Sequence, residues 1–80
     1  MKTAFKSSFA KDLKSIKSKP LHESVTKLIE RVEAAPNLAA IPNVKKLKAK
    51  GNYYRMRLGE FRVGIAVKKD EVTFVRCLDR

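Results

Sequence analysis

The sequence predicts an α+β fold in which an N-terminal helical hairpin packs on one face of a small antiparallel β-sheet. Two observations predict it. Apolar residues recur at helical spacing up to about residue 34, and from Tyr53 onward apolar and polar residues alternate with a period of two. A chain of 80 residues without a linker or a low-complexity stretch is expected to form one domain, residues 1–80.

Two helices are predicted in the N-terminal part, after a short strand that can form at residues 2–5. The first helix is interrupted at residues 18–20, because the residue before a proline avoids the α region. The second runs from about Leu21 to Ala34, and the short break between the two favours an antiparallel pair. Their apolar stripes are Phe5, Phe9, Leu13 and Ile16 in the first helix and Val25, Leu28, Ile29 and Val32 in the second.

Residues 36–52 are predicted to be irregular and form the longest such stretch of the chain. They contain a cluster of lysines, which either keep the chain soluble or contact phosphate groups, and the pattern alone leaves both interpretations open. The lysines are Lys45, Lys46, Lys48 and Lys50.

Residues 53–67, YYRMRLGEFRVGIAV, predict a β-hairpin with Gly59-Glu60 as a two-residue loop of type II′. One face of this hairpin is apolar and is expected to pack against the helices; it consists of Tyr54, Met56, Leu58, Phe61, Val63, Ile65 and Val67. The other face brings three pairs opposite each other, namely Arg57 and Arg62, Arg55 and Gly64, and Tyr53 and Ala66.

A third strand is predicted from Glu71 to about Leu78, after a turn at Lys69-Asp70. Its phase is ambiguous, because Val72 and Phe74 fall in one phase and Val75 and Cys77 fall in the other. The pattern therefore does not fix which face of the sheet carries Arg76.

Arg57 and Arg62 would place like charges directly opposite each other, which destabilises a sheet. Arginine offers forked donors that match phosphate oxygens, and its charge does not titrate away. With the small residues Gly64 and Ala66 as a floor beside them, we interpret this face as an anion site. The alternative is a solvated strand face on which Glu60 and Asp79 act as local counter-ions.

The composition limits the partners of this chain. Nineteen Lys and Arg against eight Asp and Glu give a formal net charge of +11, which indicates a polyanion or an acidic protein as the partner. No apolar run approaches the ~18 residues of a membrane span, and the N-terminus has no apolar signal region. A single cysteine fits a reducing compartment, so we expect a cytoplasmic protein.

Two residues of types that often carry chemistry are expected to be structural. Cys77 lies in an apolar strand pattern without an activating base, and we expect it to be buried in the core. His22 lies off the apolar stripe of its helix, with no second ligand-type residue in support, and we expect it on the surface. No metal ion or cofactor is therefore expected.

At motif level the chain resembles the RelE/ParE toxin superfamily of bacterial type II toxin–antitoxin systems. The resemblance rests on VKKLKxxGNYYRMRLGEFRVGIAV, on EVTFVRCLDR and on the opening FKSSFAKDLKSI, and it covers nearly all 80 residues. It implies a RelE-like fold and a ribosome-dependent mRNA endonuclease (an mRNA interferase) that inhibits translation. It also implies an acidic antitoxin as partner, in a hetero-oligomer. The alternatives are a ParE-like inhibitor of DNA gyrase and a catalytically weak relative that only binds RNA or the ribosome.

The resemblance also implies roles for individual residues. Arg57 and Arg62 would clamp the phosphate, Arg55 would hold the reactive nucleotide, and Arg80 would neutralise or protonate the leaving oxygen, without a metal. RNA contacts are expected from Lys45, Lys46, Lys48, Lys50 and Tyr53.

The sequence departs from the RelE pattern at its C-terminal end. RelE-type chains usually continue past the last strand with a short basic segment that carries a tyrosine, whereas this sequence ends at Arg80. Three interpretations follow: a truncated form, weak activity, or catalysis that relies on the ribosome. Tyr53 is not assigned the role of the missing tyrosine.

Overall fold

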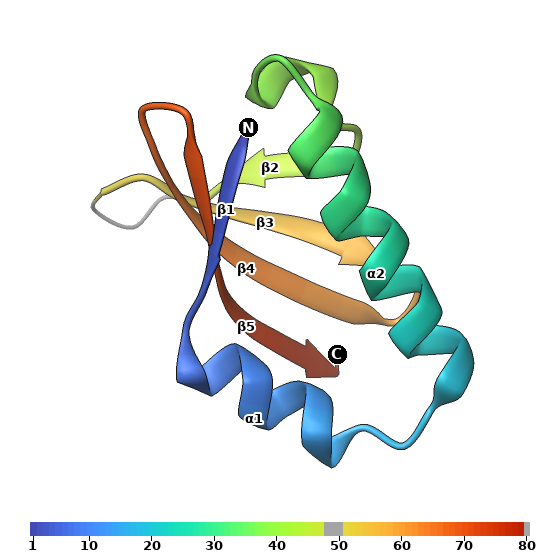
Figure 1. Cartoon of the computed structure of the whole chain (residues 1–80). Coiled ribbons are helices and arrows are strands. Elements are labelled where there is room, and N and C mark those ends of the chain that lie inside the picture. The colour runs from blue at the N-terminus through green and yellow to red at the C-terminus, as the bar shows by residue number, and fades with distance from the viewer. Residues whose placement is uncertain (48–50, 80) are drawn as a thin grey trace.

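The structure, a computed structural model, describes residues 1–47 and 51–79 and has the predicted α+β class (Figure 1). Two helices lie on one face of a five-stranded sheet. In chain order the elements are β1 (Lys2–Phe5), α1 (Ser7–Ser15), α2 (Lys19–Ala34), the 3₁₀ helix η1 (Leu38–Ala40), β2 (Val44–Lys46), β3 (Tyr53–Leu58), β4 (Phe61–Lys68) and β5 (Glu71–Asp79).

The sheet is mixed rather than purely antiparallel. Its strand order is β1-β5-β4-β3-β2, and the pairs β5–β4, β4–β3 and β3–β2 are antiparallel as predicted. Strand β1 instead runs parallel to β5, with Lys2 beside Glu71 and Phe5 beside Phe74. The first and last strands of the chain are thus neighbours, a long-range pairing that local patterns do not reveal.

The first residues of the two helices differ from the predicted ones by a few positions. Helix α2 begins at Lys19, two residues before the predicted start, because the Ser18 side chain accepts a hydrogen bond from the Leu21 N–H and Pro20 is tolerated in a first turn. Helix α1 begins at Ser7, so Phe5 belongs to β1. The helices diverge from their short connection, with α1 beside β5 and α2 across the sheet (Figure 1).

The core lies between the helices and one face of the sheet, and it contains the predicted apolar sets except Phe5, which is 51% exposed. In the hairpin Met56, Val63 and Ile65 are fully buried. The rest of the predicted hairpin face packs around them, and both helix stripes contribute to the same cluster. The buried members are Phe9, Leu21, Val25, Val32, Ala35, Ile41, Met56, Val63, Ile65, Val72, Phe74 and Cys77.

A β-bulge in β5 resolves the ambiguous phase of this strand. Gly64 pairs with Arg76 but the next residue, Ile65, pairs with Phe74, so Val75 is an extra residue on β5. Phe74 and Cys77 therefore both point into the core although they are three residues apart. Arg76 lies beside Gly64 on the opposite face.

The outer edge of β5 is covered first by β1 and then by α1. Strand β1 pairs only with residues 71–74 of β5. Beyond that point the Ser8 hydroxyl donates to the carbonyl of Val75 at 2.6 Å, and the Cys77 N–H donates to the carboxylate of Asp12 at 2.9 Å. Side chains of α1 thus satisfy backbone groups that a free edge would leave unpaired.

The stretch predicted to be irregular contains two short elements, and this part of the prediction was wrong. Besides η1, residues 44–46 form β2, which pairs with residues 54–56 of β3. Three residues, two of them lysines, give no readable alternation, and such short charged strands are typical of sheet edges.

No helix within the described ranges is long and apolar enough to cross a membrane.

Candidate functional site

The sheet face opposite the helices, here called the open face, carries the predicted arginine cluster. The hairpin register is confirmed: Arg57 lies opposite Arg62, and Arg55 lies opposite Gly64. Gly59 has φ +62°, as the first loop position of a type II′ turn requires. By register, the open face includes Lys45, Tyr53, Arg55, Arg57, Arg62, Gly64, Ala66, Thr73, Arg76 and Leu78.

Arg57 and Arg62 occupy directly paired positions of the open face. The pair that closes a two-residue hairpin exchanges hydrogen bonds, so Arg57–Arg62, the next pair, is of the closer kind, with Cα atoms about 4.5 Å apart. Both line a hollow of about 50 Å³ at the hairpin end, together with Gly59, Glu60 and Phe61. Within the described residues no hydrogen bond or ion pair holds either guanidinium or Glu60. The pair is therefore available to an external anion.

Arg55 lies two residues before Arg57 on the same face of β3, farther from the hairpin loop, and is half-buried. Its Nε atom is shielded from solvent and has no hydrogen-bond partner in the part of the chain that the structure describes. A buried donor without an acceptor costs about 1–3 kcal/mol, and a charged one costs more. Lys45 faces Arg55 from β2, so the same row holds a second positive charge. An anion bound here would satisfy the Nε donor.

Arg76 is an open-face residue that the sequence did not assign. Its side chain reaches from β5 to α1, where Nε and Nη2 donate to the two carboxylate oxygens of Asp12 at 2.8 and 3.2 Å. The hydrogen bond from Arg76 holds the pKa of Asp12 below its usual range, and the Cys77 N–H adds to the effect. The bulge in β5 interrupts the alternation of this strand, and the sequence carries no local signal for it. Alternation alone therefore could not assign Arg76 to a face.

The other predicted contact residues divide between the faces. Tyr53 lies on the open face opposite Ala66 and is 46% exposed, so its ring is accessible to a base. Lys45 lies on the open face, whereas Lys46 pairs with Tyr54 and so lies on the side of the sheet that the helices cover. Lys48, Lys50 and Arg80 lie outside the described residues.

Cys77 and His22 have the structural positions that were predicted. Cys77 is 2% exposed, and burial raises the pKa of its thiol, which therefore stays protonated at neutral pH. His22 is exposed, and its Nε2 lies 2.6 Å from the carbonyl of Ile16, where it bridges the connection between the helices. In the described ranges no three His, Cys, Asp or Glu side chains lie close enough together to hold a metal ion.

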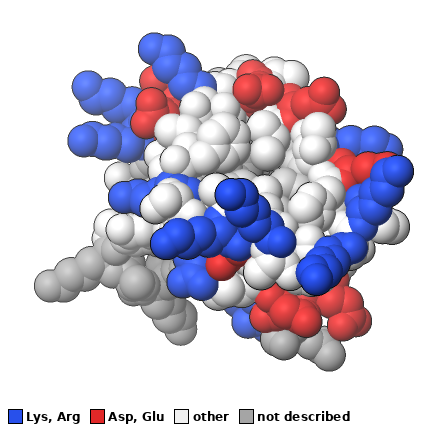
Figure 2. Space-filling view, turned by 60° about the horizontal axis from the view of Figure 1, so that its bottom comes forward, with Lys and Arg blue, Asp and Glu red and all other residues white. Residues whose placement is uncertain are grey.

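The surface charge is broadly positive. Figure 2, which turns the lower side of Figure 1 toward the viewer, shows several groups of Lys and Arg side chains on the visible surface, with Asp and Glu side chains in smaller groups between them. This agrees with the formal net charge of +11. Such a surface attracts polyanions and acidic proteins from solution.

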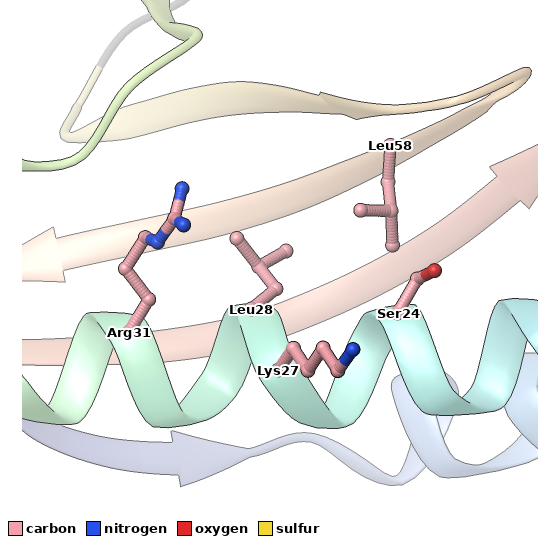
Figure 3. A pocket seen from close by; sticks show the side chains of 5 residues that line it. All are labelled: Ser24, Lys27, Leu28, Arg31 and Leu58. Carbon is pink, nitrogen blue, oxygen red and sulfur yellow. The ribbon is translucent and has the colours of Figure 1, made fainter.

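A second surface feature is a groove between α2 and β3 (Figure 3). It has a volume of about 240 Å³ and is lined by Ser24, Lys27, Leu28, Arg31 and Leu58, here called the α2–β3 groove. In Figure 3 the side chains of Leu28 and Arg31 point from the helix toward the sheet, and Leu58 points back toward the helix. The groove thus combines an apolar floor with a basic rim. Beside the groove, the edge of β3 that faces away from β4 is paired with β2 only up to Met56 in the described part of the sheet.

Comparison with known proteins places these features in a family. No protein-family model matches the chain. Toxin RelE3 of Methanocaldococcus jannaschii is 36% identical over 81 residues, which cover 100% of this chain and 91% of the relative. The structure matches a chain of the RelB–RelE antitoxin–toxin complex from Methanococcus jannaschii with a TM-score of 0.84 at 34% identity, over 96% of this chain and 89% of that chain. The YoeB–YefM complex from Staphylococcus aureus shares the fold alone, with a TM-score of 0.77 at 20% identity over 100% and 97% of the two chains.

Two helices on one face of a five-stranded sheet, in a small basic chain with these relatives, define a toxin of the type II toxin–antitoxin class. The full-length identity to Toxin RelE3 also shows the family. The chain belongs to the RelE family of toxins.

Proposed function

We propose that this toxin is a metal-independent endoribonuclease that cuts messenger RNA on the ribosome in the cytoplasm and so inhibits translation. The observation that carries the proposal is the Arg57–Arg62 pair. Two guanidiniums face each other on the open face, and no counter-ion holds either of them among the described residues. Their mutual repulsion is relieved when a phosphate lies between them.

The proposed reaction is an internal transfer at one phosphodiester of the RNA. The 2′-oxygen attacks the adjacent phosphorus, and its bond to phosphorus forms as the bond from phosphorus to the 5′-oxygen breaks. The products are a 2′,3′-cyclic phosphate and a free 5′-hydroxyl. One proton leaves the 2′-hydroxyl and one is delivered to the 5′-oxygen, so no co-reactant is consumed.

The arginines serve the charge that develops in this reaction. Arg57 and Arg62 stabilise the extra negative charge on the phosphate oxygens in the transition state. Stabilisation of such charge by fixed hydrogen-bond donors is usually the largest single contribution to the rate of an enzymatic reaction. Arg55 holds the reactive nucleotide through its unpaired Nε donor. For Arg80 we keep the proposed role at the leaving oxygen, and Tyr53 and Lys45 contact the neighbouring RNA.

Dependence on the ribosome follows from what the arginines cannot do. Arginine stays protonated in proteins and is a very weak base. Glu60 borders the hollow at the hairpin end, but no hydrogen bond within the described residues orients it toward the arginines. We therefore assign the transfer of the 2′-hydroxyl proton to groups of the ribosome, so that the free protein cuts RNA poorly.

The proposed protein partner is an acidic antitoxin that occupies the α2–β3 groove. Leu28 and Leu58 form an apolar floor that accepts one apolar side chain of the partner. Lys27 and Arg31 form a basic rim that pairs with acidic residues around it. The RelB–RelE structure is an antitoxin–toxin complex, which supports an assembly of this kind.

The test is induced expression in cells, followed by primer extension on a translated message. Wild-type protein is expected to produce cuts within translated codons and to stop protein synthesis. A message without a start codon, which ribosomes do not translate, serves as the control and is expected to stay intact. Growth arrest with intact messages and accumulating DNA breaks would contradict the proposal and favour a gyrase target.

A further inference from the structure

We infer that Leu47 and Tyr53 form a platform for a nucleobase on the open face, here called the base platform. The inference deepens the proposed RNA-cutting function and rests on it. The base platform holds a base of the strand whose reacting phosphate is clamped by Arg57 and Arg62. The toxin would thus grip its substrate by a base as well as by a phosphate.

The exposed apolar side chains of the protein gather on the open face. Among the described residues four large apolar side chains are exposed, and three of them, Leu47, Tyr53 and Leu78, lie on this face. Leu78 stands alone beside Arg62, and single exposed leucines are common on protein surfaces. Leu47 and Tyr53 are instead cross-strand neighbours, because the Leu47 N–H donates to the carbonyl of Tyr53 at 3.0 Å and continues the β2–β3 register. A continuous exposed apolar surface with a polar rim is typical of a binding site.

The fold uses neither of these two side chains for its core. Leu47 is 36% exposed and Tyr53 is 46% exposed, and both lie outside the core cluster. On the β4 side Tyr53 pairs with Ala66, whose methyl group is too small to cover the ring. In the part of the chain that the structure describes, no other aromatic ring stacks on Tyr53 and no group binds its hydroxyl. The ring is therefore available to a partner from outside the protein.

Gly51 holds the ring of Tyr53 in place. A Cβ atom on Gly51 would lie 3.3 Å from Cε2 and 3.4 Å from Cδ2 of Tyr53, so this side of the ring packs against the glycine backbone. Gly51 also has φ +93°, a conformation that favours glycine. A ring that is already held in one position loses little conformational entropy when a base stacks on it.

The cations beside the base platform indicate what binds there. Lys45 and Arg55 form the next row of the open face, and Arg57 and Arg62 form the row after it. Proteins that bind single-stranded nucleic acid combine a basic groove that follows the phosphates with aromatic side chains on which bases stack. Here alternate residues of β3, namely Tyr53, Arg55 and Arg57, supply both parts on one face. The ligand that fits this arrangement is a nucleobase of a single strand.

The distance to the arginine clamp shows which nucleotide the base platform holds. Tyr53 lies four residues from Arg57 along β3, which corresponds to roughly 14 Å. The phosphate and the base of one nucleotide lie closer together than this. The bound base therefore belongs to a nucleotide other than the reacting one. Loss of the base platform should accordingly remove a base contact and leave the phosphate contacts in place.

The experiment measures the binding of two fluorescent RNA octamers by anisotropy over a series of salt concentrations. Both octamers are 2′-O-methylated, which prevents cleavage, and one of them lacks its bases but keeps its phosphates. Tyr53→Leu is expected to weaken binding of the octamer with bases about fivefold, because one stacking contact is lost. Binding of the abasic octamer and the salt dependence should stay unchanged, because no phosphate contact is lost. Leu47→Ala is expected to act in the same way, by roughly threefold.

Three controls separate the base platform from other effects. Tyr53→Phe keeps the ring and should bind as the wild type does. Phe5→Leu removes a ring from β1, where Phe5 is 51% exposed and stacks on Phe74, and should leave the binding of both octamers unchanged. Arg62→Gln tests the proposed function and should weaken binding of both octamers, with a slope of log affinity against log salt that is lower by about 0.7. Thermal unfolding checks that each variant is folded.

Outcomes that overturn the inference are distinct from those that overturn the proposed function. The base platform is refuted if Tyr53→Leu binds the octamer with bases as the wild type does, or if it loses as much affinity for the abasic octamer. A loss in Tyr53→Phe equal to that in Tyr53→Leu also refutes it, because the ring is then not the binding group. In each of these cases an impaired Arg62→Gln leaves the proposed function standing. If Arg62→Gln binds both octamers as the wild type does, the proposed function fails instead, and a loss in Tyr53→Leu that is confined to the octamer with bases would still show a base on the platform.

Discussion

Arg57 and Arg62 face each other across the β3–β4 hairpin, two permanent positive charges on directly paired positions of the open face. The residues next to them in sequence, Met56 and Val63, are fully buried on the opposite side. One hairpin thus supplies the core with one face and the proposed anion site with the other. The repulsion between the arginines is a local weakness of the fold, and it has measurable consequences.

The first prediction is that relieving this repulsion stabilises the protein. Arg57→Gln keeps the length of the side chain and removes one of the facing charges, so the free energy of unfolding is expected to rise by about 0.2–1 kcal/mol. Urea unfolding at low salt measures the change. Lys14→Gln is the matched control and should be nearly neutral. A loss of stability in Arg57→Gln would show that the pair is not repulsive in the folded protein.

The second prediction concerns the neighbour of Arg57 on the buried face. Met56 is 0% exposed, so Met56→Ala leaves a cavity and is expected to lower the free energy of unfolding by about 2–5 kcal/mol. Adjacent substitutions should therefore act in opposite directions on stability. Equal effects at the two positions would contradict the assignment of the two faces.

The third prediction is a pH dependence that comes from Asp12. The pKa of Asp12 is lowered in the folded state by the hydrogen bond from Arg76, so its ionised form stabilises the fold. This stabilisation is fully present above the unfolded pKa of about 3.9 and is lost as the pH falls through the lower folded value. The difference in stability between the wild type and Asp12→Asn should accordingly be larger at pH 6 than below pH 3. A difference that stays constant over this range would rule out the ion pair as its source.

The fourth prediction addresses the α2–β3 groove. Reversing both rim charges, in Lys27→Glu with Arg31→Glu, is expected to slow association with the antitoxin by about tenfold at low salt, because such charges steer the encounter. The loss should shrink as salt is added. Surface plasmon resonance with the cognate antitoxin measures both. The control is Lys14→Glu with Lys17→Glu, which changes the net charge equally at two residues of α1 and the connection after it that do not line the groove. An equal loss in this control would show that the groove is not the binding surface.

The hairpin could be predicted in full from the sequence because local rules determine it. Strict alternation assigns each side chain to a face, and Gly59-Glu60 fixes the register, so the sequence alone predicts the facing pair Arg57–Arg62. The core stripes of both helices were predicted for the same reason, since periodic burial is readable in one sequence.

Features that depend on contacts between distant parts of the chain could not be predicted in this way. The parallel pairing of β1 with β5 joins the two ends of the sequence. The extra residue Val75 in β5 shifts the phase by one, and only the paired strand reveals it. Arg76 was left unassigned for that reason. Lys46 lies on the helix-covered side, which could not be predicted because β2 itself was missed.

The most direct test of the central claim is cleavage of a translated message by the wild type and by Arg62→Gln, measured by primer extension in a reconstituted translation reaction. We expect the wild type to cut only when ribosomes translate the message. Arg62→Gln should cut roughly 100-fold more slowly or worse, as is typical when one transition-state donor is lost, and urea unfolding should show it at least as stable as the wild type. Cleavage by Arg62→Gln at the wild-type rate would contradict the assignment of the facing arginines to the reaction.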